Sequence, residues 1–175
     1  MFQNKEKEVY FSESESVSDY SYINIYKMSE KFAYYKKSNI GIHFVIDKEE
    51  TGLWHTYLIA INEDNYDKYK EIIDYSYNRT DKEPKPIKVY GYPVIVNKKL
   101  KELTISNIDK FIPKDNEIKI TKDNYDEYLT NSYLDTTIDK KDTFNIALCA
   151  SLITILILIV LFFITLFDKG KKTTN

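Results

Sequence analysis

One stretch near the end of the chain limits most strongly what the chain can fold into. Residues 144–167 form a run of 24 residues without a single charged side chain. As a helix that rises about 1.5 Å per residue, the run is roughly 36 Å long, enough to cross a hydrocarbon layer of about 30 Å with some tilt. A core helix of a small domain is usually shorter and keeps a polar stripe. The run therefore predicts a single C-terminal transmembrane helix over residues 144–167.

The residues that follow the run favour a membrane span over a cleaved lipid-anchor signal. A signal of that kind has small residues at its cleavage site and normally ends within its hydrophobic tail. Here Lys169, Lys171 and Lys172 follow, in a short basic tail of residues 168–175. The only cysteine, Cys149, lies inside the run, so one chain can form neither a disulfide framework nor a Cys-based metal site.

The rest of the chain has the composition of a small, polar, water-exposed domain. The net charge of the whole chain is −2, and the basic tail contributes +2, so residues 1–143 carry −4. That charge is too small to indicate nucleic acid or an acidic substrate as a partner. We expect a mobile segment rich in Ser and acidic residues over 1–22, an α+β domain over 23–134 and a linker over 135–143.

A β-hairpin is the clearest structural pattern of the domain. Side chains at residues 40–47 alternate with a period of two, and Gly52 follows in a turn-forming stretch. The second strand, over residues 53–61, is apolar on both faces, which is typical of a central strand covered on both sides.

Helices and further strands follow the hairpin. Residues 62–76 have helical spacing behind Asn62 as a cap, and residues 97–105 have the pattern of a short helix. A strand over 87–96 contains Gly91 and Pro93, which indicate a bulge or an edge position. A short strand over 118–120 then leads into a helix that Thr121 would cap. The fold class is therefore α+β, a small mixed or antiparallel sheet with two to three helices.

A short sequence occurs twice. Residues 59–69 (IAINEDNYDKY) and 118–128 (IKITKDNYDEY) share seven of eleven positions. In each copy we expect a strand to enter a helix whose two tyrosines, three residues apart, face the core. The similarity has two interpretations, ordinary strand-to-helix chemistry in an Asp/Asn/Tyr-rich chain or an internal duplication. The carboxylates lack the glycine turn of a calcium-binding loop.

The two histidines, His43 and His55, are the only candidate site residues. Both lie on the expected hairpin, where they stand opposite each other if paired positions sum to 98 and on opposite faces if they sum to 99. A facing pair could bind a metal or respond to pH, but no third ligand is evident. We therefore expect no catalytic residue, no metal site and no cofactor, and the isolated glycines form no phosphate-binding loop.

These patterns favour a non-catalytic binding or regulatory module anchored in the bilayer through residues 144–167. We expect a protein partner at the membrane. The alternative is a membrane-attached enzyme that uses His43 and His55. The lysines beside the run, three after it and two before it, decide little about orientation. Because no signal sequence precedes the domain, we expect the domain to be cytoplasmic.

Overall fold

The computed structural model divides the chain into two units, Met1–Ile138 and Asp139–Asn175. We describe each unit by itself. The residues that the structure describes are 9–34, 39–48, 52–111, 119–138, 148 and 150–161.

The first unit has the predicted α+β composition and a mixed sheet. Its strands are β1 (Val9–Tyr10), β2 (Ser21–Ile25), β3 (Lys27–Met28), β4 (Ala33–Tyr34), β5 (Ile40–Lys48), β6 (Trp54–Asn62), β7 (Ile87–Ile95) and β8 (Ser132–Asp135). The order across the sheet is β1-β2-β7-β8-β6-β5-β3, and β4 pairs with β5. The β1/β2 and β6/β8 pairs are parallel, and the other pairs are antiparallel.

The chain itself connects the two ends of the row of paired strands from β2 to β3. Strands β2 and β3 are separated only by Tyr26, yet β2 pairs with β7 and β3 pairs with β5. The Tyr26 N–H still donates to the Ile46 carbonyl at 3.0 Å. In a regular strand one residue separates two side chains on the same face. Ile25 and Met28 are both fully buried although two residues separate them, so the segment contains one residue more than regular alternation requires. Such an extra residue bends a strand, and at this bend the chain leaves its pairing with β7 and begins its pairing with β5.

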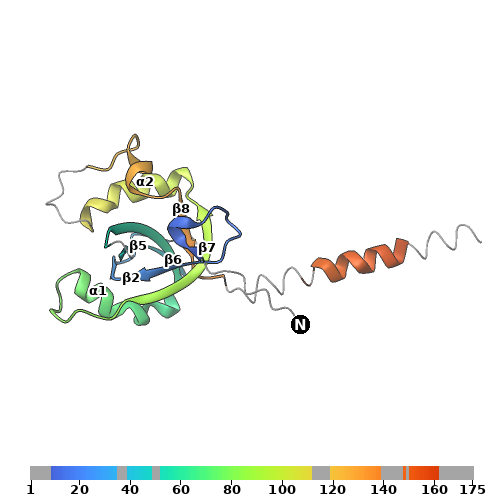
Figure 1. Cartoon of the computed structure of the whole chain (residues 1–175), viewed down its shortest axis with the longest axis horizontal. Coiled ribbons are helices and arrows are strands. Elements are labelled where there is room, and N and C mark those ends of the chain that lie inside the picture. The colour runs from blue at the N-terminus through green and yellow to red at the C-terminus, as the bar shows by residue number, and fades with distance from the viewer. Residues whose placement is uncertain are drawn as a thin grey trace, which may run out of the picture. The chain divides into compact units, whose positions relative to one another are not determined.

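Two hydrophobic cores lie on the two faces of this curved sheet. We call the face that carries Ile23, Val45, Ile59 and Val89 the inner face, and the opposite face the outer face. The helical segments are η1 (Phe11–Glu13), η2 (Glu63–Tyr69), α1 (Lys70–Ser76), α2 (Lys98–Asn107), η3 (Ile108–Lys110) and α3 (Tyr125–Tyr128). Residues of η1, η2 and α1 pack in the inner core, and residues of α2, η3 and α3 pack in the outer core. Figure 1 shows α1 and α2 on opposite sides of the sheet.

The hairpin and the first two helices confirm the sequence predictions. Strands β5 and β6 pair along their whole length, and β6 is covered on both faces. The Asn62 side chain accepts from the Asp64 N–H at 3.0 Å, so it caps η2. Asn97 likewise caps α2 by accepting from the Leu100 N–H at 2.9 Å.

The prediction for the second copy of the repeated sequence was wrong in its details. Lys119 and Ile120 lie in no strand. Thr121 caps no helix, because its N–H and hydroxyl both donate to the Asn124 side chain. The helix itself, α3, is only one turn long, and Ile118 lies outside the described residues.

Strand β7 changes its partner half-way along its length. Residues 87–91 pair with β2, and residues 92–95 pair with β8. A Cβ added at Gly91 would overlap the Asp135 carbonyl group, so the close approach to β8 requires glycine there. Among the described strands only β8 pairs with β7 at Pro93. Pro93 therefore has a paired strand on one side only, as at the edge position that the sequence suggested.

Two segments differ from the expected domain limits. Of the segment expected to be mobile, residues 9–22 belong to the fold, since Val9–Tyr10 pairs with β2 and Phe11 is buried; residues 1–8 lie outside the described residues. Asp135, expected to begin the linker, ends β8. Strand β8 was missed because it is too short to show a period, although Tyr133 packs in the outer core and Leu134 in the inner core.

In the second unit, the described residues of the predicted span, 148 and 150–161, are helical. Their large apolar side chains are 47% (Leu148) to 64% (Leu156) exposed. Within the part of the chain that the structure describes, no helix has both the length and the apolar character needed to cross a membrane. Cys149 and the other residues of 144–167, like residues 139–143 and the basic tail, lie outside the described residues.

Candidate binding sites

The structure does not bring His43 and His55 together. His43 pairs with Ile59 and His55 pairs with Asp47, so the paired positions sum to neither 98 nor 99. Both histidines lie on the same face, four residues apart along the hairpin, or about 13 Å at 3.3 Å per residue. No cross-strand histidine pair exists, and among the described residues no group of three His, Cys, Asp or Glu side chains could hold a metal ion.

His43 is completely buried at one end of the inner face, where its ring lies between a carbonyl and a carboxylate. Its Nδ1 lies 3.0 Å from the Ser29 carbonyl oxygen. Because a carbonyl only accepts, Nδ1 carries the proton in the neutral ring. The lone pair on Nε2 then faces Glu63 Oε1 at 3.5 Å, and neither atom has a hydrogen-bond partner.

The His43 environment disfavours the charged ring in spite of that carboxylate. Burial lowers the pKa of His43 below its ordinary value, and the Ser29 carbonyl and the Glu63 carboxylate oppose the shift only in part. Lys31 neutralises Glu63 through an ion pair of 2.7 Å. This arrangement is a buried neutral histidine that responds to acid, and it offers no open position for a substrate.

A second polar cluster lies at the other end of the inner face, around Asp47. The Asp47 side chain is fully buried, and its Oδ2 accepts from the Tyr10 hydroxyl at 2.7 Å and from the Asn24 N–H at 2.9 Å. Burial, and then the hydrogen bond to Asp47, raise the pKa of Tyr10 well above its usual range. The cluster ties the N-terminal strand to β5. The alternation of side chains along β5 places Asp47 on the inner face, so this pattern could have indicated a buried carboxylate at that position.

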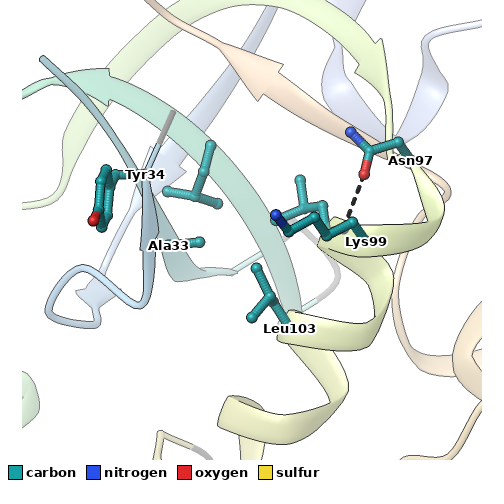
Figure 2. Close-up of a pocket in the computed structure, with 7 residues that line it drawn as sticks. Ala33, Tyr34, Asn97, Lys99 and Leu103 are labelled. Atoms are coloured by element: carbon teal, nitrogen blue, oxygen red, sulfur yellow. Dashed lines mark hydrogen bonds between the residues drawn. The ribbon is translucent and has the colours of Figure 1, made fainter. Parts of the chain in front are cut away.

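An apolar pocket lies between β4 and the first turns of α2 (Figure 2). Its volume is about 220 Å³. The residues that line it are Ala33, Tyr34, Ile42, Asn97, Lys99, Leu100 and Leu103. The buried members Ala33, Ile42 and Leu100 form its floor, whereas Tyr34 is 70% exposed and Leu103 37% exposed at its rim. The Asn97 cap holds this end of α2 in place, so the pocket is built on ordered elements.

A more polar cavity of about 300 Å³ lies between β7 and the junction of β6 with η2. It is lined by Ile61, Asn65, Lys68, Tyr69, Lys88, Val89, Tyr90 and Thr136. Strand β8 separates β7 from β6 only as far as Asp135. Thr136 then binds the Ala60 carbonyl through its N–H (3.0 Å) and its hydroxyl (2.8 Å). The cavity therefore lies where β8 would continue; we call it the β7/β6 slot.

Tyrosines gather on the outer face of β2 and β7 beside the slot. Tyr20 stacks on Tyr90 and contacts Tyr92, and Tyr22 contacts Tyr90. The Lys88 ammonium lies 3.7 Å from the centre of the Tyr22 ring. These half-buried rings form an aromatic border beside the slot, and the cation of Lys88 lies against that border.

Comparison with known proteins gives no relative from which a role could be transferred. No family model, no curated protein and no solved structure matches the chain. The function has to be argued from the pockets and surfaces described above.

Proposed function

We propose that this chain is a single-pass, membrane-anchored binding module without catalytic activity of its own. Residues 144–167 anchor it, and the first unit binds a protein partner at the membrane surface. The anchor is supported by the uncharged run and by its described helical residues, which expose large apolar side chains such as Leu156 and Leu158. A contiguous apolar surface of this kind is favourable in lipid and costly in water.

The pocket of Figure 2 is the observation that carries the binding role. Its volume lies below the roughly 300–1,000 Å³ of typical small-molecule pockets. One or two apolar side chains of a protein partner suit its floor of Ala33, Ile42 and Leu100. Tyr34 and Lys99 then supply polar contacts around the inserted side chain, as at the rim of protein interfaces. Tethering to the bilayer raises the local concentration of the module for membrane-bound partners.

The anchor is tested by extraction of membranes with alkaline carbonate. The full chain is expected to stay in the pellet, and a chain that ends at residue 143 is expected in the supernatant. Release of the full chain by carbonate would contradict the anchor.

The same proposal places the first unit in the cytosol. Single cysteines at Ser18 and at Thr174, each in a Cys149→Ala background, can be labelled in intact cells with a membrane-impermeant thiol reagent. Labelling of the Thr174 variant alone is expected. Labelling of the Ser18 variant alone would move the unit to the outside of the cell.

The pocket is tested by placing a photo-crosslinking amino acid at Tyr34 in the membrane-bound chain. A discrete crosslinked protein is expected, and Leu103→Glu should abolish it by putting a charge into the apolar pocket. The matched control is Ile95→Glu, since Ile95 is 69% exposed and lies outside the pocket. Crosslinking that survives Leu103→Glu would exclude the pocket as the binding site.

A further inference from the structure

The β7/β6 slot lies where the next residues of β8 would continue between β7 and β6. Neighbouring strands lie about 4.8 Å apart, so two strands with a third between them are about 9.6 Å apart. Strand β8 fills this space beside Tyr92–Ile95 of β7 and beside Ile59–Ala60 of β6. Beyond Thr136 the chain turns out of the sheet, because the Thr137 N–H bonds to Asp135 Oδ1 at 2.9 Å. The space that β8 would enter next is the cavity of about 300 Å³.

The walls of the slot combine a sheet-like floor with positive charge. Ile61 and Val89 belong to the inner core and form its apolar wall, while Asn65 and Thr136 add polar groups. Among the described residues that line the slot, the charged ones are Lys68 and Lys88. Lys68 comes from η2 and Lys88 from β7, and the Lys88 ammonium lies over the Tyr22 and Tyr90 rings. The positive charge of these two residues favours carboxylates on a strand that enters the slot.

We propose that the β7/β6 slot binds an extended, acidic segment of a partner protein as an added strand in line with β8. The segment runs antiparallel to β7, as β8 does, and places apolar side chains toward Ile61 and Val89. Its acidic side chains meet Lys68 and Lys88. Strand addition of this kind takes its affinity from main-chain hydrogen bonds and its specificity from alternate side chains. The proposal concerns a site separate from the pocket of Figure 2 and does not depend on the membrane anchor.

The direct test uses a synthetic strand as the probe. The fluorescent peptide acetyl-TEVEVT-amide is titrated with the full chain in detergent micelles, and binding is followed by anisotropy. The double variant Lys68→Glu/Lys88→Glu is expected to weaken binding at least tenfold, and the peptide TKVKVT is expected to bind that variant instead. The matched control Lys85→Glu/Lys98→Glu makes the same change in net charge at two exposed lysines away from the slot.

A methylated peptide separates strand addition from simple charge attraction. An N-methyl group on the first valine of TEVEVT removes a main-chain donor and should reduce binding at least fivefold. Equal binding of the methylated peptide, equal loss with the control variant, or no binding of TEVEVT at millimolar concentration would each overturn the proposal. Binding that arises only when residues 139–143 are replaced by a Gly/Ser sequence would assign the slot to this chain's own segment, and would also overturn it.

Discussion

The two copies of the repeated sequence, residues 59–69 and 118–128, end in different cores. In the first copy Tyr69 is buried (4% exposed) in the inner core, and Tyr66 is only partly buried. In the second copy the burial is reversed: Tyr125 is fully buried in the outer core, and Tyr128 is 41% exposed. The two copies share seven residues, yet the tyrosine that is buried differs between them.

The segments that follow each copy explain the difference. After the first copy the chain continues into α1, whose Ile72 and Ile73 pack in the inner core and bring Tyr69 with them. After the second copy the helix stops after one turn, and extended Leu129 enters the outer core next to Tyr125. Two tyrosines at i and i+3 lie on one helix face, but tertiary packing selects which of them is buried. The two copies thus share local chemistry without sharing a tertiary environment.

The largest expected effect comes from removing the buried tyrosine of either copy. Tyr125→Ala and Tyr69→Ala should each lower the free energy of unfolding by about 3–5 kcal/mol, the usual cost of truncating a buried aromatic side chain. Tyr128→Ala and Tyr66→Ala should cost clearly less, because their rings are more exposed. Urea unfolding of the four variants measures the difference. A larger cost at Tyr128 than at Tyr125 would show that the second copy packs as the first does.

Gly91→Ala should loosen both cores together. The added Cβ would overlap the backbone of Asp135 and Thr136, which cannot move without separating β7 from β8. Strand β8 supplies Leu134 to the inner core and Tyr133 to the outer core. We expect a loss of about 3 kcal/mol, at the upper end of overpacking costs, and faster amide exchange in β7 and β8.

Gly41→Ala is the matched control for that variant. A Cβ there meets side chains and no backbone: the nearest atom is Oε1 of Glu63, the end of a flexible side chain, followed by His43 Nε2 and Lys31 Cδ. The loss should be about 1 kcal/mol and should affect the inner core alone. An equal loss in both variants would contradict the role assigned to the β7/β8 contact.

The inner core should also be the more sensitive of the two to acid, because it contains His43. The pKa of His43 in the folded state lies below its ordinary value of 6.5. As the pH falls below about 6.5, the unfolded chain gains a proton that the folded chain does not. Stability that is present above this pH is therefore lost as the pH falls toward the folded pKa, by at most about 1.4 kcal/mol per pH unit.

Unfolding of wild type and His43→Gln at a series of pH values from about 7.5 to 5.5 isolates this contribution. The wild-type chain should lose stability more steeply than the variant. Equal slopes would show that His43 takes up its proton without cost in the fold.

Local patterns in the sequence were sufficient for the hairpin and the first two helices, but not for β1 to β4, for β8 or for the way the sheet closes. The period of two gave β5, the apolar run gave β6 its central place, and Asn62 marked the start of η2. Closure depends on one extra residue, Tyr26, and on β8, which is four residues long; neither leaves a periodic signal. The register of the hairpin, and with it the separation of His43 from His55, depends on pairing that short-range patterns do not encode. The β7/β6 slot results from the same pairing, so no residue pattern in the sequence indicates it.

The smallest expected effect distinguishes how the two copies begin their helices. Asn62→Ala removes the oxygen that accepts from the Asp64 N–H and should cost about 1 kcal/mol, the usual value for a lost helix cap. Thr121→Ala should cost less, because its hydroxyl only donates to the Asn124 side chain at 3.2 Å and caps nothing. Asn124 keeps its bonds to the Thr121 N–H and the Lys119 carbonyl in that variant. A Thr121→Ala cost equal to that of Asn62→Ala, measured by urea unfolding, would mean that the second copy is capped as its sequence first suggested.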